Sequence, residues 1–434
     1  MWHNEAYAPI PVSFQDVGGY FASPPGESVD GTLYPWGWDS PDFDDSQWET
    51  PAVPQFWRAE ITRMRGSTLT GEGAKWQLIP RSIPQMEETL IRFDQVRRTQ
   101  GIDTDGAFLR REGDLVIRAR TKATLLLDQA HLTNAYTVVQ LSGGAGSQVT
   151  MTFAEALLDA EGQKGNRNEI EGKSIRGIRD VIRPDGGENR QYHSLWFRTY
   201  RYVQLDIETA NQSLRIHDLH GIFTGYPFEL KAKFSSNLDW LKDVWEIDWR
   251  VARLCAWETY FDTPYYEQLQ YIGDTRIQGL VTLYMSDDDR LVRQAISHFD
   301  WSRMPEGITA SRYPSDLPQY IPTFSLIWIA MVHDYWMHRD DEAYVRSMLP
   351  GIRGVIGWYE RRMDATGLVG PIPWWPFVDW ADGWNMGKPP GASDGHSIMV
   401  NLQLVYALQR AAELEDHFGL KEEGRRFRVL ADVI

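Results

Sequence analysis

The sequence contains a single cysteine, Cys255, among its 434 residues. One cysteine excludes an internal disulfide framework and any zinc site built from several cysteines. The chain also lacks an apolar run of about 18 residues, so no segment is predicted to span a membrane. Basic residues are outnumbered, with 44 Lys and Arg against 60 Asp and Glu, which gives a net charge of −16. This balance argues against nucleic acid and anionic membranes as partners, because both require basic surfaces.

Signals for targeting, metals and cofactors are also missing. Residues 1–5 show no basic stretch followed by an apolar one, so no signal peptide is visible and no compartment is assigned. The ten histidines lack the paired spacing of a metal site, and the glycines of 143–146 are followed by neither the helix nor the lysine of a phosphate-binding loop. We therefore expect no metal and no cofactor. The sequence assigns no oligomeric state.

Aromatic residues are abundant, with 19 Trp, 19 Tyr and 17 Phe. Their flat apolar faces and polar edges suit stacking on sugar rings. Large protein cores use the same residues, so composition leaves both explanations open.

Residues 1 to about 235 are predicted to be mostly β. Segments 146–153 and 202–207 alternate polar and apolar residues with the period of a half-buried strand. The glycines of 143–146 predict a turn between two such strands. In contrast, 159–187 is rich in Gly, Asn, Lys and Arg and is predicted to be a long loop.

Closely spaced strands without intervening helices favour antiparallel β-sandwiches. A weak break falls between Pro80 and Pro84. We therefore predict a small ancillary β domain, jelly-roll-like, over residues 1–80, followed by a β-sandwich domain over residues 81–234.

From about residue 235 the pattern becomes helical. Ser236 and Asn237 are helix-capping residue types that precede the first apolar-periodic stretch. The predicted helices are about 236–260, 274–285, 287–300, 322–338, 340–365, 393–418 and 421 onward. Serial helix pairs of this length form either a solenoid or a closed α/α toroid.

The last predicted helix is still amphipathic at Ile434, with no polar tail. The helices number about half of what a six-hairpin barrel needs. We therefore expect residues 235–434 to be the N-terminal half of an (α/α)6 toroid from a longer protein. Half a toroid would expose apolar helix faces.

Three carboxylates, Asp262, Glu267 and Asp274, lie among aromatic residues in a predicted interhelical loop. Apolar walls raise the pKa of a carboxylic acid, and a proton held near neutral pH is what glycosidic bond cleavage requires. Ionised carboxylates also bind adjacent sugar hydroxyls. The alternative is structural, with Asp274 as a helix N-cap and Asp262 as a turn former.

The acidic run resembles the signature of the α-L-rhamnosidases of glycoside hydrolase family 78. The matching positions are Asp262, Thr263, Pro264, Glu267, Tyr271, Gly273 and Asp274. Other segments resemble the family in the same order, namely 43–48, the linker 76–84, the sandwich strands at 153–155 and 198–202, and the active-site loop 377–380. The resemblance implies β-sandwich domains followed by an (α/α)6 barrel. It also implies inverting hydrolysis of terminal α-L-rhamnose from glycosides or polysaccharides.

The resemblance also implies residue roles. Glu267 corresponds to the general acid, and Asp262 and Asp274 would hold the rhamnose hydroxyls. Tyr271 stands where the family usually has Trp and would pack on the apolar face of the sugar. Asp379 and Trp380 would contact the substrate, with Trp380 as a second aromatic platform. Tyr320 lies roughly where another family aromatic does, and a loop aromatic that packs on a helix explains it equally well.

The chain also departs from the family in the residues that flank the acid and in the general base. In the family, arginines commonly flank the general acid, but here Tyr266 and Gln268 flank Glu267. The resemblance therefore leaves the identity of the sugar undecided. The family's general base lies on a late hairpin and is expected beyond Ile434. Asp379 and Asp382 are the in-chain alternatives, although both are expected to contact substrate instead. Two other functions therefore stay open: a glycan-binding fragment without activity, and a six-hairpin glycosidase that acts on another sugar.

Overall fold

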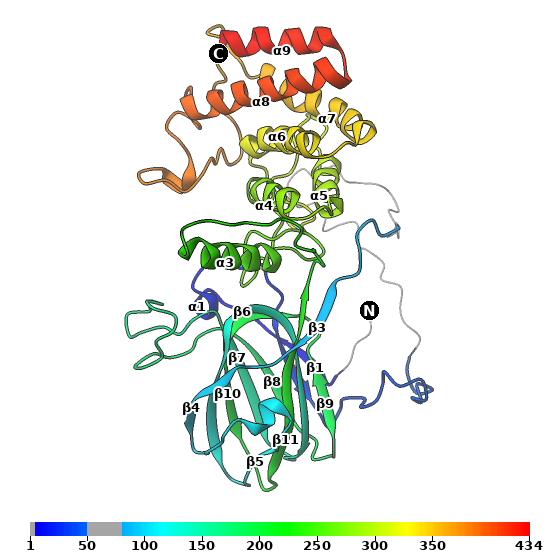
Figure 1. The fold of residues 1–434 in the computed structure, drawn as a ribbon, viewed down its shortest axis with the longest axis vertical. Helices are drawn as coiled ribbons and strands as arrows, with labels where there is room; N and C mark the ends of the chain where they lie inside the picture. Colours follow the sequence, from blue (N-terminus) through cyan, green and yellow to red (C-terminus); the bar gives the residue numbers. More distant parts are fainter. Residues whose placement is uncertain (1–4, 50–79) are drawn as a thin grey trace. The chain divides into compact units, whose positions relative to one another are not determined.

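The computed structural model describes residues 5–49 and 80–434. Residues 76–79 of the predicted linker lie outside this part of the chain. The chain divides into two compact units. The first unit comprises Met1–Gly19, Pro24–Arg81 and Thr89–Phe223, and the second comprises Tyr20–Ser23, Ser82–Glu88 and Thr224–Ile434. The chain is thus β in its first part and α in its second, as the sequence predicts (Figure 1).

The β part is built on one extended sheet. Its strands are β1 (Tyr7–Ile10), β2 (Gly26–Asp30), β3 (Glu87–Ile91), β4 (Gln95–Gln100), β5 (Leu115–Ile117), β6 (Lys122–Gly143), β7 (Gln148–Ala154), β8 (Ile178–Arg183), β9 (Arg190–His193), β10 (Arg198–Glu208) and β11 (Leu214–Gly225). The sheet order is β1-β2-β8-β7-β10-β6-β11-β3, with β4 and β9 also on β6 and β5 on β11. A short helix, α1 (Phe14–Val17), precedes β2.

The long strand β6 organises the sheet. Its first half pairs with β10 and β4, and its second half pairs with β11 and β9. Ala130, in the left-handed region at φ 66°, lies at the irregularity in the pairing with β10, where the register shifts between Tyr200 and Tyr202. The turn predicted at 143–146 is confirmed, because Gly143, Gly144 and Gly146 have positive φ between β6 and β7.

Two expectations for the β part need correction. The predicted loop over 159–187 contains strand β8, whose buried and exposed residues alternate. Polar composition concealed this strand, because its exposed residues are Arg179 and Arg183 and one of its buried residues is Asp180. The pairing of β2 with β8 is parallel, not antiparallel. These strands are distant in sequence, so no hairpin turn dictates their direction. A separate domain over residues 1–80 stays a prediction, although β1 and β2 belong to the sheet.

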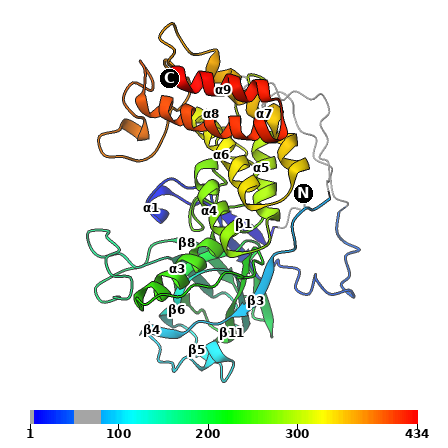
Figure 2. The same ribbon diagram turned by 45° about the horizontal axis from the view of Figure 1, so that its top comes forward.

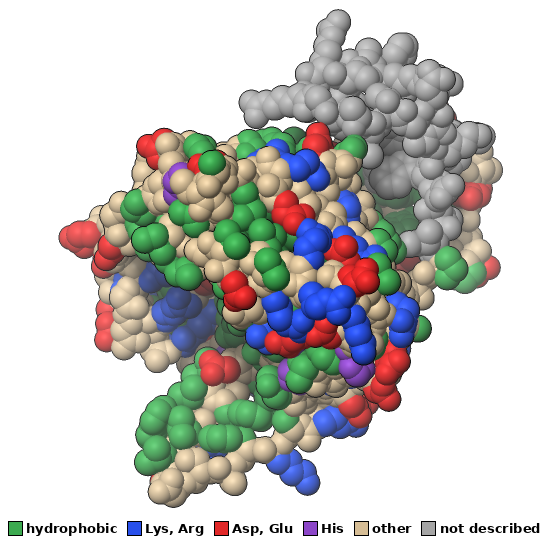
Figure 3. Space-filling model, turned by 90° about the horizontal axis from the view of Figure 1, so that it is seen from above, with side chains coloured by type: hydrophobic (Ala, Val, Ile, Leu, Met, Phe, Trp, Pro, Cys, Tyr) green, Lys and Arg blue, Asp and Glu red, His purple; other side chains and the backbone are tan. Residues whose placement is uncertain are grey.

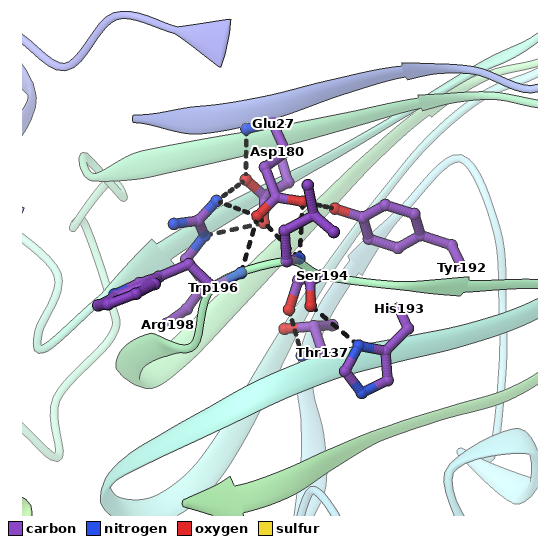
Figure 4. Close-up of polar contacts among 9 residues, drawn as sticks. Glu27, Thr137, Asp180, Tyr192, His193, Ser194, Trp196 and Arg198 are labelled. Atoms are coloured by element: carbon purple, nitrogen blue, oxygen red, sulfur yellow. Dashed lines mark hydrogen bonds and ion pairs between the residues drawn. The ribbon is translucent and has the colours of Figure 1, made fainter. Parts of the chain in front are cut away.

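A buried polar network attaches β2 to the sheet (Figure 4). Glu27, Asp180 and Arg198 are each at most 2% exposed. Arg198 donates to both Asp180 oxygens and to Glu27, while the backbone N–H of Glu27 donates to Asp180 at 2.8 Å. Glu27 also accepts from Tyr192 at 2.8 Å and from the backbone of Leu195. Burial and the neighbouring Asp180 raise the pKa of Glu27, which lessens the negative charge that one arginine must balance.

The helical part follows the predicted order closely. The helices are α3 (Trp240–Leu254), α4 (Ile272–Met285), α5 (Arg290–Trp301), α6 (Pro322–His338), α7 (Glu342–Glu360), α8 (Ile398–Phe418) and α9 (Lys421–Val433). The largest difference is α3, which is shorter than predicted at both ends. Beyond Leu254 the chain turns back, and Ala256 forms a β-bridge with Tyr260. Ser236 accepts the Leu238 N–H in a turn and does not cap the helix.

The helices pack in two rows, visible in Figures 1 and 2. Helices α4, α6 and α8 pack on one another in one row, while α5 and α7 pack against α6, and α9 packs on α8. Arg276 on α4 ties the first row together, because it donates to Asp334 on α6 and to Tyr406 on α8. One continuous apolar core, which includes the buried Trp328 and Trp358, joins the rows.

The surface of the helical unit is uneven in polarity. On the face seen in Figure 3, acidic and basic side chains are interspersed. Ion pairs on α8 and α9 include Arg426–Glu423 and Arg428–Asp416. In contrast, α4 exposes Ile277, Val281 and Tyr284, which lie on one side of the helix. No helix of the described residues combines the length and apolarity that a bilayer crossing requires.

Candidate active site

A cavity of about 570 Å³ opens in the helical unit. This volume lies within the range of small-molecule sites. Most lining residues are apolar or aromatic, and four are carboxylates. They are Tyr20, Asp262, Glu267, Tyr271, Gly273, Asp274, Ile277, Gln319, Ile321, Phe324, Ile327, Trp375, Phe377, Val378, Asp379, Trp380 and Met386. Six of the seven predicted site residues therefore line one cavity.

The loop between α3 and α4 is closed by local hydrogen bonds. The backbone N–H of Asp262 donates to the carbonyl of Leu269 at 2.9 Å, and the N–H of Leu269 donates to the Asp262 carboxylate at 3.0 Å. Gln268 sits in the left-handed region at φ 58°, and its N–H donates to Thr263. These bonds bring the carboxyls of Asp262 and Glu267 together. The predicted turn-forming role of Asp262 thus coexists with its place in the cavity.

Asp262 and Glu267 form a hydrogen-bonded carboxyl pair. Burial raises the pKa of Asp262 to about 8, and Glu267 contributes through its hydrogen bond and its charge. Two carboxylates this close cannot both ionise readily, so the pair retains a proton near neutral pH. The sequence predicted a retained proton on Glu267, and that assignment stays a prediction.

Tyr271 connects Glu267 to a buried arginine. The Tyr271 hydroxyl donates to Glu267 Oε1 at 2.7 Å and accepts from Arg312 Nη1 at 2.9 Å. Tyr271 and Arg312 are partners in an antiparallel β-bridge, which places their side chains side by side. A cation therefore reaches the acid indirectly, although the sequence positions that flank Glu267 carry none.

Asp274 lies in the first turn of α4 and faces two other carboxylates. Its pKa is raised, first by burial and then by the charges of Glu267 and Asp379. The N-cap of α4 is Tyr271, so the alternative prediction of Asp274 as an N-cap is wrong. Gly273 permits the close packing here, because a Cβ at this position would lie 3.0 Å from the ring of Phe324.

An aromatic loop forms another wall of the cavity. Trp375, Phe377 and Trp380 pack on one another with ring centroids 4.8 to 6.1 Å apart. Trp380 keeps 66% of its surface exposed. Its backbone N–H donates to one Asp379 oxygen at 2.7 Å. This arrangement presents an aromatic ring and a carboxylate next to each other.

Two residues considered from the sequence are not in the cavity lining. Tyr320 contributes its backbone carbonyl to Trp375 and packs its ring on Trp374, with centroids 5.5 Å apart. Trp374 lies in a loop, so this contact is not the packing on a helix that the sequence offered as the alternative, and a substrate contact of Tyr320 stays a prediction. Asp382 is exposed on the aromatic loop and does not line the cavity.

Sequence reasoning missed several residues that line the cavity, above all Tyr20. It also missed Arg312, which does not line the cavity but donates to Tyr271. Neither carries a local motif, and Tyr20 is far from the acidic loop in sequence. Phe324 and Ile327 belong to the first turns of a uniformly apolar helix, α6, where periodicity does not single them out. Among the described residues, no group of three or more His, Cys, Asp or Glu has the arrangement of a metal site.

Comparisons with known proteins give a family for the helical part. Residues 229–434 match the family model described as the bacterial alpha-L-rhamnosidase 6 hairpin glycosidase domain. No curated protein matches the chain. Several solved structures are similar in fold, each at low sequence identity.

The family 78 rhamnosidase of Bacillus sp. GL1 superposes with a TM-score of 0.65 at 23% identity, over 76% of this chain and 34% of that one. The rhamnosidase of Klebsiella oxytoca, solved with rhamnose bound, superposes with a TM-score of 0.66 at 17% identity, over 81% of this chain and 70% of that one. The alpha-L-rhamnosidase of Streptomyces avermitilis, solved with L-rhamnose, superposes with a TM-score of 0.64 at 15% identity, over 94% of this chain and 35% of that one. This chain thus spans about a third of the Bacillus and Streptomyces proteins.

Proposed function

We propose that this protein hydrolyses terminal α-L-rhamnosyl residues of glycosides or polysaccharides. The match of residues 229–434 to the bacterial alpha-L-rhamnosidase 6 hairpin glycosidase domain supports this proposal. The observation that carries the proposal is the carboxyl pair Asp262–Glu267, which keeps a proton inside a cavity with aromatic walls. Two of the similar structures contain rhamnose, which supports the choice of sugar.

In the proposed reaction, Glu267 protonates the glycosidic oxygen as the bond to the anomeric carbon breaks. The shared proton of the pair supplies this acid, and Tyr271 holds the Glu267 carboxyl through its hydroxyl. Asp274 and Asp379 accept hydrogen bonds from the rhamnose hydroxyls. Trp380 stacks on the apolar face of the sugar. The cavity has an arrangement suited to each of these contacts.

We propose an inverting outcome, in which a water attacks the anomeric carbon from the face opposite the acid. Such a water needs carboxyl groups about 6.5–9.5 Å apart. Asp262 is hydrogen-bonded to Glu267 and leaves no room for this water, so it is not the base. The product anomer, followed by proton NMR in the first minutes of reaction, distinguishes inversion from retention.

For the fold we propose a β-sandwich over residues 81–234, followed over residues 235–434 by helical hairpins of an (α/α)6 toroid. The row α4-α6-α8, with α5 and α7 packed against α6 and α9 packed on α8, supports the toroid. The exposed apolar side of α4 suits coverage by further helical hairpins. Strand β6 pairs with β10 over its first half and with β11 over its second half. One long strand that takes different partners along its length supports the sandwich.

Hydrolysis of p-nitrophenyl α-L-rhamnoside by the protein expressed from its complete coding sequence tests the proposal. Glu267→Gln removes the acid and is expected to lower kcat by roughly 10²- to 10⁴-fold. The matched control, Glu171→Gln, changes an exposed glutamate of the other unit and should leave kcat unchanged. Cleavage of other p-nitrophenyl glycosides but not of the rhamnoside would instead indicate a six-hairpin glycosidase for another sugar. Binding of rhamnose without turnover of any glycoside would indicate a glycan-binding protein.

A further inference from the structure

Tyr20 reaches the cavity from a segment far upstream of the acidic loop. The backbone N–H groups of Ala22 and Ser23 both donate to the carbonyl of Tyr266, at 2.9 and 3.0 Å. Tyr266 directly precedes Glu267, so the upstream segment is anchored beside the acid. The ring of Tyr20 then becomes part of the cavity wall.

Arg312 holds Tyr20 in place from behind. Its Nη1 donates to the hydroxyls of both Tyr20, at 3.1 Å, and Tyr271, at 2.9 Å. The guanidinium carbon lies 6.0 Å from the centroid of the Tyr20 ring and 5.6 Å from that of Tyr271. Arg312 is only 6% exposed, whereas Tyr20 is 53% exposed. The hydroxyl of Tyr20 is therefore engaged by the protein, while much of its ring stays open.

We propose that Tyr20 forms a wall of the subsite for the leaving group and stacks on an aromatic or pyranose ring there. This inference rests on the proposed function, in which Glu267 delivers its proton to the glycosidic oxygen. That oxygen departs with the leaving group, so the leaving group lies beside Glu267. Tyr20 approaches Glu267 through Arg312 and Tyr271, and not through the carboxylates that hold the rhamnosyl ring.

The chemistry of the contact follows from which part of Tyr20 is open. Its hydroxyl already accepts from Arg312, so the ring face is the part offered to a ligand. Ring faces stack on other aromatic rings and on the C–H faces of pyranoses. A leaving group with neither ring makes no such contact. Tyr20 would thus select among leaving groups and leave recognition of rhamnose itself unaffected.

Three substrates separate these contributions: p-nitrophenyl α-L-rhamnoside with an aryl leaving group, a rhamnosyl-glucose disaccharide with a pyranose one, and methyl α-L-rhamnoside with neither. Tyr20→Ala is expected to lower kcat/KM about 3- to 10-fold on one or both ring-bearing substrates, and less than about twofold on the methyl glycoside. A lower kcat/KM on the p-nitrophenyl glycoside alone would indicate a subsite for aryl groups, and a lower kcat/KM on the disaccharide alone would indicate a subsite for a pyranose. The inhibition constant of free L-rhamnose is expected to stay unchanged.

Two controls accompany this variant. Tyr20→Phe keeps the ring and removes the hydroxyl, so it should retain wild-type preference among the three substrates. Phe14→Ala removes a similarly exposed aromatic from the same N-terminal region, outside the cavity lining, and should have no effect.

Several results would overturn the subsite. Equal loss on all three substrates, or weaker inhibition by L-rhamnose, would mean that Tyr20 supports the rhamnosyl site. A Tyr20→Phe variant as impaired as Tyr20→Ala would mean that the bond to Arg312 matters and the ring does not. Wild-type protein that hydrolyses no α-L-rhamnoside would overturn the proposed function and the subsite with it. If only the results for the Tyr20 variants contradict the subsite, turnover by the wild-type protein still supports the proposed function.

Discussion

The hydroxyl of Tyr271 donates to Glu267 Oε1 at 2.7 Å and accepts from Arg312 Nη1 at 2.9 Å. The positions on either side of Glu267 are Tyr266 and Gln268, where the resemblance leads one to expect arginines. Arg312 comes from a different loop and acts on the acid through the tyrosine. The substitution of Tyr for Trp at position 271 is what makes this connection possible, because an indole cannot accept a hydrogen bond from an arginine.

Tyr271→Phe keeps the ring and removes the hydroxyl that orients Glu267. Loss of one hydrogen bond of about 0.5–1.5 kcal/mol predicts a decrease in kcat of roughly 2- to 10-fold, with a smaller change in KM. Steady-state kinetics on p-nitrophenyl α-L-rhamnoside provide the measurement. Tyr284→Phe, also on the α4 segment but outside the cavity, is the matched control. A change in KM alone would assign Tyr271 to sugar binding and not to positioning of the acid.

Asp262 makes the stability of the fold depend on pH. Its pKa is raised from 3.8 to about 8, so the folded state binds more protons than the unfolded state between these values. The stability contributed by protonated Asp262 is complete below about pH 4 and is lost as the pH rises through about 8. Asp262→Asn removes this dependence, because the amide does not titrate.

Thermal unfolding of wild type and Asp262→Asn from pH 4 to pH 9 tests this expectation. The difference between the two midpoints should change steadily in favour of the variant as the pH rises toward 8. Asp382→Asn, an exposed change outside the cavity, should follow the wild-type curve. Parallel curves for wild type and Asp262→Asn would show that position 262 does not titrate in this range.

Asp379 and Asp382 are neighbours on one loop, and only Asp379 lines the cavity. If Asp379 holds a sugar hydroxyl, Asp379→Asn should raise KM by about 10-fold or more, as expected for loss of a charge-assisted hydrogen bond of roughly 1.5–3 kcal/mol. Asp382→Asn should leave KM within about twofold of wild type. Added azide, a nucleophile that needs no base, should not restore the activity of Asp379→Asn. Recovery with azide would assign the general base to Asp379.

Arg198 balances two buried acids, Glu27 and Asp180 (Figure 4). Arg198→Met leaves these acids without their cation, which is expected to cost about 3–5 kcal/mol of unfolding free energy. Arg179→Met is the matched control, because Arg179 is on strand β8 with half of its side chain exposed and should change stability by less than about 0.5 kcal/mol. Urea unfolding of the two variants measures both values. Equal stabilities would show that the network contributes little to the fold.

Much of the helical part could be predicted from the sequence, because each helix carries an apolar face with a period that is read locally. The ranges of α4, α6 and α9 agree with the prediction closely. Strand β8 was missed, since its solvent-facing residues are charged and resemble loop composition. The parallel pairing of β2 with β8 has no local signal at all, because the two strands meet only in the folded chain.

The candidate site divides in the same way. Asp262 and Glu267 are close in sequence, and short-range hydrogen bonds from Asp262 to Leu269 bring them together. Their juxtaposition was therefore open to prediction. The raised pKa of Asp262 was not, because it depends first on how deeply this carboxyl is buried in the folded unit.

The sequence by itself determined the helices and the acidic loop, since both arise from periodicity and contacts between near neighbours. Only the tertiary structure decided that Tyr20 and Arg312 meet at this loop. Their approach depends on the backbone bonds from Ala22 and Ser23 to Tyr266 and on the bridge between Tyr271 and Arg312. Such contacts join segments whose separation along the chain leaves no periodic trace, so they exist only once the whole unit is packed.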